Sequence, residues 1–487
     1  MEASELLLLE PNTLILLFGA VLTAAAFEAV NGFHDTANAV ATVIYTNSLS
    51  PRSAVVLSGV CNFLGVYLGG TGVAFAIVHL LPMDLLVDVG SKASTAMIFA
   101  ILISALAWNV ATWYKGIPAS SSHTLIGAII GVGLTNALVR GEPFFHNTNL
   151  ANVEAVIISL LLSPIIGFTL AAAVFLFLRK WIRYGRLFEP PWDNKPPSWI
   201  RIVLVISSSG VSFAHGSNDG QKGVGLIMII LIAYLPAHFA LNLEYERNNW
   251  DLRTQSLSQM GTMIQSKKSE IENQINSQDS EMRERGGNLS SGLFDQMSQE
   301  LEKVLSALDK RDSVAYVSPE KRLQLRKSIL LLEDRFKSLE GSGIMYLTET
   351  EKGILNSARA ELRGMTDYAP PWVMLMVAIA IGMGTMIGWK RVVVTVGERI
   401  GNRPMNYAQG ASSQMVAMLT IGLADVLGVP VSTTQVLSSG VAGTMVANRV
   451  TLKYRTVRDI ALAWVLTLPV ATLLGGTLFL VFVLLGT

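Results

Sequence analysis

The sequence contains one cysteine, Cys61, among 487 residues, so neither an internal disulfide nor a cysteine-based metal cluster can form. Charged residues make up only 15% of the chain, whereas soluble domains carry about 25%. The formal net charge is +1, which gives no electrostatic basis for binding nucleic acid. These scarcities argue against an ordinary soluble enzyme and against a nucleic-acid-binding protein.

Hydrophobic residues are abundant, at 51% of the chain, and the mean hydropathy is +0.45. The charges are unevenly spread. Residues 242–369 hold 21 Asp/Glu and 18 Lys/Arg, more than half of all the charged residues. The rest of the chain is so apolar that we expect helices in lipid, where backbone groups must be satisfied internally.

Long apolar stretches predict an all-α polytopic membrane protein with about 10–12 membrane segments. Two of them, 12–46 and 202–240, are too long for one straight span and contain Gly, Asn and Asp in the middle, which predicts broken or re-entrant helices. The stretches that approach or exceed the ~20 residues of a spanning helix are 12–46, 53–81, 94–114, 118–139, 153–178, 202–240, 370–389, 404–424, 430–448 and 459–486.

Three basic segments predict the orientation. Residues 179–201, 390–403 and 449–458 each carry an excess of Lys and Arg, so we expect them in the cytoplasm. Ten crossings then place both termini and the charged segment outside. The first residues, MEASELLLLE, lack Lys and Arg, which favours a retained span over a secretory signal.

These features divide the chain into five expected parts. They are a first transmembrane repeat (1–178), a cytoplasmic linker (179–201), the start of a second repeat (202–241), a soluble helical insertion outside the membrane (242–369) and the rest of the second repeat (370–487). Within the insertion, Ser318-Pro319-Glu320 resembles a helix start. Helical spacing is seen in Leu293, Met297, Leu301, Val304, Leu305 and Leu308.

Two pairs of motifs indicate an internal duplication. Residues 32–42 read GFHDTANAVAT and residues 216–226 read GSNDGQKGVGL, while 118–128 read PASSSHTLIGA and 430–440 read PVSTTQVLSSG. Asp35 lies 83 residues before Pro118, and Asp219 lies 211 residues before Pro430. The difference between these two spacings equals the length of the insertion, 242–369. Five expected crossings separate the two Asp residues, so the second copy would be inverted, an arrangement typical of transporters.

Charged residues inside the spans are the first site candidates, because burying charge in lipid is costly. Asp35 and Asp219 occupy matching positions in the two motifs. Glu28 lies seven residues before Asp35, near the same helix face, and is a candidate proton or cation site. We expect Asp425 to lie at the membrane edge.

The hydroxyl-rich motifs predict an anion site at two helix N-termini, where free N–H groups and the helix dipole attract negative charge. Packing of Ser and Thr between helices is the alternative. Three histidines adjoin the motifs, His34, His123 and His215, and are either packed residues or proton or metal groups. The hydroxyl candidates are Ser120, Ser121, Ser122, Ser432, Thr433 and Thr434.

The acids bear on which anion would bind. A partly protonated oxyanion has P–OH groups that can donate to an ionised Asp, and a cotransported cation can lie between carboxylate and anion. Sulfate has no proton to donate at neutral pH. The acids therefore favour phosphate or arsenate over sulfate, if they touch the substrate.

At these motifs the chain resembles the inorganic phosphate transporter (Pit) family, especially its bacterial low-affinity phosphate permeases. The resemblance covers roughly 12–240 and 369–486 and implies phosphate symport with a cation. Two departures stand out. His34 replaces the Asn that often precedes the Asp, and Lys222 stands where the family has Asn, while Asn38 is kept. A Lys ammonium beside Asp219 would substitute for a sodium ion or pair with phosphate.

The sequence thus predicts a secondary transporter that imports phosphate with a proton, or as a metal–phosphate complex, by alternating access. The alternatives are a sodium-coupled symporter and a sulfate or other oxyanion permease. An intramembrane hydrolase using Ser122 and His123 lacks an oxyanion-hole motif. The expected phosphate ligands are Asp35, Asn38, Ser120, Ser121, Ser122, Asn218, Asp219, Lys222, Ser432, Thr433 and Thr434.

The expected coupling groups for the proton or cation are Glu28, His34, Asp35, Asp219 and His123. No covalent cofactor is expected, and Mg²⁺ is the candidate cotransported metal. The expected partners are phosphate, H⁺ or Na⁺, and the lipid bilayer of the inner (plasma) membrane, and not nucleic acid. A homo-oligomer is left open.

Overall fold

A computed structural model describes residues 10–81, 91–143, 150–191, 196–245, 250–276, 280–308, 314–342 and 347–486. The chain divides into two compact units. One, here called the membrane body, comprises Leu6–Ile230 and Ala369–Thr487. The other, the insertion unit, comprises Met1–Glu5 and Leu231–Tyr368.

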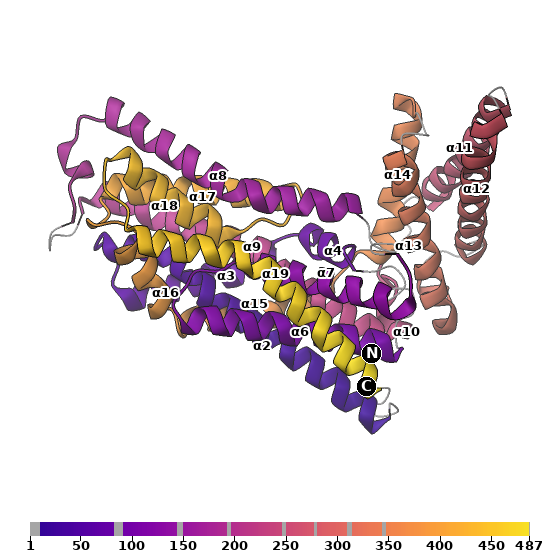
Figure 1. The fold of residues 1–487 in the computed structure, drawn as a ribbon, viewed down its shortest axis with the longest axis horizontal. Coiled ribbons are helices and arrows are strands. Elements are labelled where there is room, and N and C mark those ends of the chain that lie inside the picture. The colour runs from indigo at the N-terminus through magenta and orange to yellow at the C-terminus, as the bar shows by residue number, and fades with distance from the viewer. Residues whose placement is uncertain are drawn as a thin grey trace. The chain divides into compact units, whose positions relative to one another are not determined.

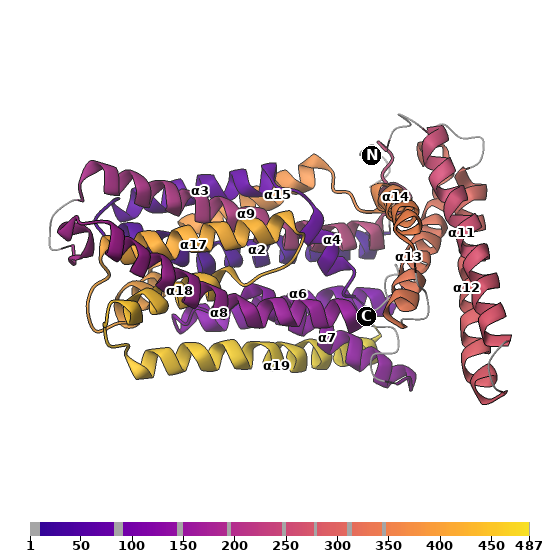
Figure 2. The same cartoon turned by 90° about the horizontal axis from the view of Figure 1, so that it is seen from above.

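The membrane body is a bundle of long helices (Figures 1 and 2). Helices α2, α6 and α19 run alongside one another in both views. The body consists of α2 (Pro11–Tyr45), α3 (Pro51–Leu68), α4 (Gly72–Val78), α6 (Lys92–Tyr114), α7 (Ser121–Arg140), α8 (Leu150–Trp181), η1 (Gly185–Phe188), most of α9 (Ser198–Tyr234), α15 (Pro371–Met386), α16 (Lys390–Val394), η3 (Thr395–Arg399), α17 (Tyr407–Val426), α18 (Thr433–Ala447) and α19 (Tyr454–Leu485).

Each of the ten apolar stretches is mainly helical, although 53–81 is divided into α3 and α4, and this confirms the all-α polytopic class. Among the described residues, seven helices are long and apolar enough to cross a membrane, or up to eight if a bent pair that includes α15 is counted. The expected spans 404–424 and 430–448 form α17 and α18. Helix α18 has only 15 residues, and α17 buries polar side chains such as Gln409 and Gln414, so hydropathy overstated the apolar character of this region.

The expected breaks within 12–46 and 202–240 are wrong at the motifs, because α2 and α9 run through them as unbroken helices. The glycines there allow close packing instead. A Cβ on Gly32 would collide with the backbone oxygen of Ile381 in α15, and one on Gly216 would collide with that of Asn62 in α3. Each motif glycine thus lets its helix lie directly against a neighbouring backbone.

Helices α7 and α8 each pack along a helix from the other half of the chain, α7 against α19 and α8 against α18. Glycines make both contacts close. A Cβ on Gly131 would meet the backbone oxygen of Thr472, and one on Gly443 would meet that of Phe168. Gly131 and Gly443 are separated by the same 312 residues as Pro118 and Pro430. The two glycines thus occupy matching positions of the two predicted repeats, and each brings its helix against a helix from the other half of the chain.

The three basic segments meet at one end of the membrane body. Arg179 donates to Asn448 Oδ1 at 3.0 Å, and Lys453 Nζ donates to the carbonyl of Glu398 at 3.0 Å. Gly401 and Leu452 form a β-bridge. These contacts join 179–201, 390–403 and 449–458 into a single cationic face, as a shared side of the membrane requires.

The insertion unit contains its own hydrophobic core, formed by residues including Leu257, Met297, Phe336 and Leu362. The predicted apolar stripe lies in α12, and α13 begins at Pro319, as the Ser-Pro-Glu sequence predicted. Its helices are α10 (Pro236–Phe239), α11 (Trp250–Asn276), α12 (Ser280–Leu308), η2 (Val314–Tyr316), α13 (Pro319–Ser342) and α14 (Glu349–Thr366).

Candidate functional site

The two motif carboxylates come together inside the membrane body. Asp35 on α2 and Asp219 on α9 are 3% and 1% exposed. The Ser121 hydroxyl lies 3.3 Å from Asp35 Oδ2 and 3.2 Å from Asp219 Oδ2, so one O–H serves both acids. Residues that are 184 positions apart in the chain thus form one buried site, which we call the carboxylate pair.

The two hydroxyl-rich segments share one local structure. Gly116 (φ 67°) and Gly428 (φ 66°) adopt left-handed conformations that end α6 and α17, and the chain then turns through Pro118 or Pro430. Prolines were expected in the first helical turn, but each lies two residues before the N-cap. The N-caps are Ser120, which accepts from the amide of His123, and Ser432, which accepts from that of Gln435. Capping satisfies an otherwise free N–H at each helix start.

The remaining hydroxyls show that the two helix starts converge. Thr434 Oγ1 donates to Asp35 Oδ1, so Asp35 is bonded by hydroxyls from both segments. Ser122 Oγ donates to the carbonyl of Val431 at 3.0 Å. Thr433 is buried, but among the described residues neither carboxylate of the pair bonds its hydroxyl. Two of the six expected hydroxyls, Ser120 and Ser432, act as caps.

Lys222 brings a positive charge to the carboxylate pair. Its side chain is 0% exposed, and Nζ lies 2.8 Å from Asp219 Oδ1 and 2.5 Å from Ser122 Oγ. A buried ammonium is tolerated only when it is paired and hydrogen-bonded. The lysine therefore links the second Asp motif to the first hydroxyl segment.

His215 faces both carboxylates. Its Nδ1 lies 2.9 Å from Asn62 Oδ1, and the Asn62 amide donates to Thr385 Oγ1 at 2.9 Å, which fixes Oδ1 as an acceptor. The proton therefore lies on Nδ1. Nε2 lies 3.7 Å from Asp35 Oδ2 and 3.5 Å from Asp219 Oδ2. Ligand atoms of Asp35, His215 and Asp219 all lie within 4.8 Å of one another, close enough to share one cation.

The expected coupling groups lie around this centre. His34 Nδ1 is 3.2 Å from Asp35 Oδ1, and its Nε2 is 3.3 Å from Thr112 Oγ1. Glu28 accepts from Asn31 at 3.4 Å through one oxygen, and among the described residues its buried Oε1 has no hydrogen-bond partner.

Two other predicted residues, the phosphate ligand Asn218 and the coupling group His123, are less directly placed. Asn218 Nδ2 donates to the carbonyl of Val429 at 3.3 Å, so it supports the second turn rather than the carboxylate pair. His123 is buried, and its backbone amide is used by the cap. The side chain of Asn38 lies outside the described residues.

Asp425, expected only at the membrane edge, contacts the second Asp motif. At the end of α17, Asp425 accepts from Ser217 at 2.5 Å and from Gln221 at 2.7 Å, both on α9. These bonds fix the second Asp motif to the turn at Gly428. Asn62 was missed altogether, because a lone Asn in an apolar stretch gives no signal of its histidine partner.

The family profile described as "Phosphate transporter family" matches residues 31–475. The chain belongs to this family. It is 41% identical to the low-affinity inorganic phosphate transporter PitB of Escherichia coli K12 over 97% of both chains. It is 42% identical to a low-affinity inorganic phosphate transporter of Buchnera aphidicola subsp. Acyrthosiphon pisum over 96% of both. A solved sodium-dependent phosphate transporter shares the fold, with a TM-score of 0.53, 18% identity and coverage of 96% of this chain and 99% of that chain.

Family membership confirms the resemblance drawn from the motifs and assigns the chain to transporters rather than enzymes. In this transporter, the described site contains two carboxylates, one ammonium and hydroxyls from two helix starts. Such a set can bind an oxyanion through the ammonium and hydroxyls, and a proton or cation through the carboxylates and His215.

Proposed function

We propose that this transporter imports inorganic phosphate together with protons, by alternating access between two inverted halves. The observation that supports proton coupling is the buried Lys222 ammonium between Asp219 and Ser122. A fixed ammonium there takes the place that a small cation would occupy between a carboxylate and a hydroxyl. Sodium is then not needed at that carboxylate.

His215 supplies a place for the transported proton. Because Nδ1–H of His215 donates a hydrogen bond to Asn62 Oδ1, the neutral imidazole directs the lone pair of Nε2 toward Asp35 and Asp219. That contact is repulsive until a proton lies on Nε2. Phosphate that carries a P–OH group would donate to the same carboxylates, so substrate and proton stabilise the site together. Glu28 is a second proton group on the same helix as Asp35, and one of its oxygens has no hydrogen-bond partner in the part of the chain that the structure describes.

A metal–phosphate complex is the alternative cargo. Two carboxylates and an imidazole within 4.8 Å provide a donor set for a divalent cation. Imidazole suits Zn²⁺ and carboxylates suit Mn²⁺, whereas Mg²⁺ prefers oxygen ligands alone. A neutral complex would also lower the cost of carrying charge through lipid.

The proposal includes the orientation. The cationic face is placed in the cytoplasm, following the positive-inside rule for short loops. Helix α2 begins at residue 11 and ends at residue 45. Its last residue lies near the cationic face, because Arg201, in the basic segment 179–201, donates from Nε to the carbonyl of Ser48, just after the helix. The N-terminal end of α2 then faces outward across the inner membrane.

Uptake of radiolabelled phosphate into proteoliposomes tests the proposal, with proton and sodium gradients imposed separately. We expect a proton gradient without sodium to drive uptake. The variant Lys222→Asn should lose most of this uptake or become dependent on sodium, whereas Lys115→Asn, at an exposed lysine, should behave like the parent. A matched size-exclusion profile shows that both variants fold.

Three other outcomes would each refute a different part of the proposal. Uptake that requires sodium in the parent would refute proton coupling and leave the family unaffected. Unchanged proton-driven uptake in Lys222→Asn, without sodium dependence, would refute the role of the ammonium. Transport of sulfate in place of phosphate would refute the choice of oxyanion.

A further inference from the structure

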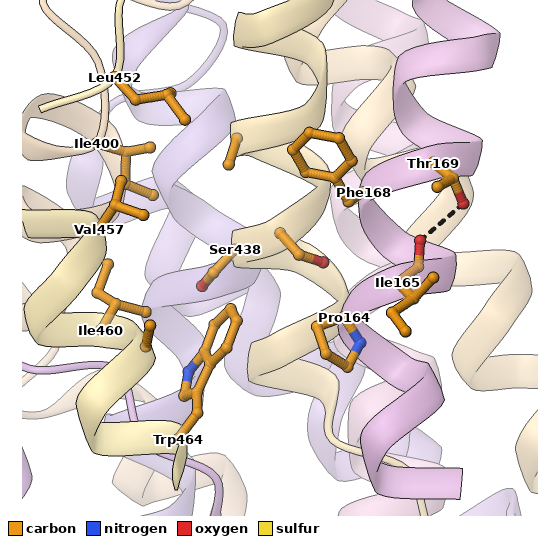
Figure 3. A pocket seen from close by; sticks show the side chains of 13 residues that line it. Pro164, Ile165, Phe168, Thr169, Ile400, Ser438, Leu452, Val457, Ile460 and Trp464 are labelled. Carbon is orange, nitrogen blue, oxygen red and sulfur yellow. Dashed lines mark hydrogen bonds between the residues drawn. The ribbon is translucent and has the colours of Figure 1, made fainter. Parts of the chain in front are cut away.

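An apolar cavity of about 360 Å³ lies in the membrane body, away from the carboxylate pair. Helices α8, α18 and α19 enclose it (Figure 3). Phe168 and Pro164 close one side from α8, while Ser438 on α18 faces Trp464 on α19. This space is called the three-helix cavity below.

The sequence explains why the three helices leave space here. Pro164 lies inside α8 and removes a helical hydrogen bond, which bends a helix. Helix α18 presents small residues along the cavity, including Ser438, Ser439 and Ala442. Small side chains bring α18 close to α8, where Gly443 lies against the carbonyl of Phe168. The same small side chains leave the space toward α19 unfilled.

The cavity is open to the lipid side. Ile165 lines it and is 57% exposed, on a helix whose outer face is apolar. Thr169 and Ser439 donate to carbonyls of their own helices, those of Ile165 and Val436. Among the described residues, the buried Ser438 hydroxyl has no hydrogen-bond partner. The cavity thus combines apolar walls with one unused polar group.

Positive charge lies beside the cavity at the cationic face. Leu452 and Val457 line the cavity, and the segment that carries them also carries Lys453, Arg455 and Arg458. Lys453 bonds the carbonyl of Glu398, and Arg458 pairs with Asp459 at 2.8 Å. Arg455 is exposed and has no hydrogen-bond or ion-pair partner within the described chain. Arg455 lies on the face of α19 opposite to the cavity-lining residues, so its charge adds to the cationic face rather than contacting the cavity. An apolar site that ends at a cationic face matches an amphiphile with an acyl chain and an anionic head.

We propose that the three-helix cavity binds one acyl chain of an anionic phospholipid, whose phosphate headgroup lies at the cationic face, within the field of the basic segment 449–458. The ester region of the lipid would offer acceptors to the Ser438 hydroxyl. A zwitterionic lipid would fill the same space but gain less from the positive charge of the cationic face, so charge complementarity selects the anionic head.

The walls of the cavity connect directly to both hydroxyl-rich segments. Trp464 Nε1 donates to the carbonyl of Pro118 at 3.2 Å, two residues before the N-cap Ser120. Ser438 is on α18, whose first residues include Thr434, the donor to Asp35. A bound acyl chain would hold Trp464 and α18 in place. Regulation of transport by the lipid rests on the proposed function, whereas lipid binding itself does not.

The test uses the full-length protein in phosphatidylcholine vesicles, with or without phosphatidylglycerol. Photoactivatable phosphatidylglycerol, with a diazirine in its acyl chain, should label α8, α18 or α19 at the cavity. Ala442→Phe, which places a ring in the cavity, should abolish that label, whereas Val446→Phe on the exposed side of α18 should not. Arg455→Gln should weaken labelling about fivefold, and Arg52→Gln, at an exposed arginine on α3, should leave it unchanged.

Phosphate uptake is measured in the same vesicles. We expect higher uptake with phosphatidylglycerol in the parent and loss of this difference in Ala442→Phe. Equal labelling by photoactivatable phosphatidylcholine, or labelling that persists in Ala442→Phe, would overturn the site. Crosslinks between two copies of the chain at the cavity would overturn it in favour of a subunit contact. If uptake fails in every vesicle, the labelling result still decides the lipid site, and only the proposed function is refuted.

Discussion

Replacing Gly32 with alanine tests how tightly the two halves are interlocked. The new Cβ would meet the backbone oxygen of Ile381 and lie 2.9 Å from the amide nitrogen of Thr385. Backbone atoms cannot rotate away as a side chain can, so α2 and α15 would have to separate. Overpacking of this kind costs about 1–3 kcal/mol, while the better helix propensity of alanine returns roughly 0.5–1 kcal/mol.

We therefore expect Gly32→Ala to lower stability by about 1–2 kcal/mol. Uptake per folded molecule should fall too, because Asp35 lies one turn further along α2. Gly216→Ala should also lower stability and uptake, since its Cβ would collide with the backbone of Asn62. Gly422→Ala is the matched control, as no heavy atom lies within 4 Å of its Cβ.

The assay is thermal unfolding in detergent followed by size-exclusion chromatography, paired with phosphate uptake normalised to folded protein. A Gly32→Ala variant as stable and active as Gly422→Ala would show that the helices are not in backbone contact there. Destabilisation by Gly32→Ala but not by Gly216→Ala would refute the equivalence of the two contacts.

Four further predictions follow from the described contacts. Ser121→Ala should lower the free energy of unfolding by about 1.5–3 kcal/mol, because a hydrogen bond to a charged group contributes that much, and should also reduce phosphate uptake per folded molecule, because Ser121 bonds both carboxylates. Asp219→Asn should reduce both folded protein and uptake, since it leaves the Lys222 ammonium unpaired, whereas Asp35→Asn should reduce uptake alone; equal yields of folded protein would contradict this. In the insertion unit, burial lowers the pKa of the Arg326 guanidinium, which donates to the carbonyls of Ala240 and Thr366 at 3.1 and 2.8 Å. Arg326→Met should speed hydrogen exchange in the insertion unit, because each buried carbonyl left unsatisfied costs about 1–3 kcal/mol. Burial also raises the pKa of Tyr368 to about 12. The neutral phenol should therefore stabilise the insertion unit below pH ~10, and this stabilisation should be lost as the pH rises to about 12. Hydrogen exchange in the unit should accelerate over this pH range in the parent but not in Tyr368→Phe.

Much of the fold could be predicted because lipid restricts the choices. Apolar length specified the helices, charge density located the insertion, and the start of α13 at Pro319 followed from local capping chemistry. The Asp and hydroxyl motifs also indicated a shared site, although Asp35 and Ser121 are 86 residues apart. In each case, the signal was local or was repeated in both halves.

The partners of individual side chains could not be predicted in the same way. Glycine at 32 and 216 is compatible with a broken helix or with close packing, and only the neighbouring backbone decides between them. His215 orients through Asn62, and Asp425 bonds Ser217 and Gln221. These contacts depend on which helices meet, a tertiary property that periodicity within one helix does not contain.

The two predicted repeats share a position of contact but differ in the chemistry at that position. Phe33 and Trp113 meet through their rings, with centroids 4.8 Å apart, where α2 meets the end of α6. Their counterparts under the repeat are Ser217 and Asp425, which meet through a hydrogen bond where α9 meets the end of α17. Lys222 adds its ammonium to the same second copy. Both helices therefore carry buried charge, Glu28 and Asp35 on α2 and Asp219 and Lys222 on α9, but only α9 pairs a carboxylate with an ammonium on the same helix. Proton coupling should therefore depend on both helices, and the ammonium distinguishes the second motif from the first.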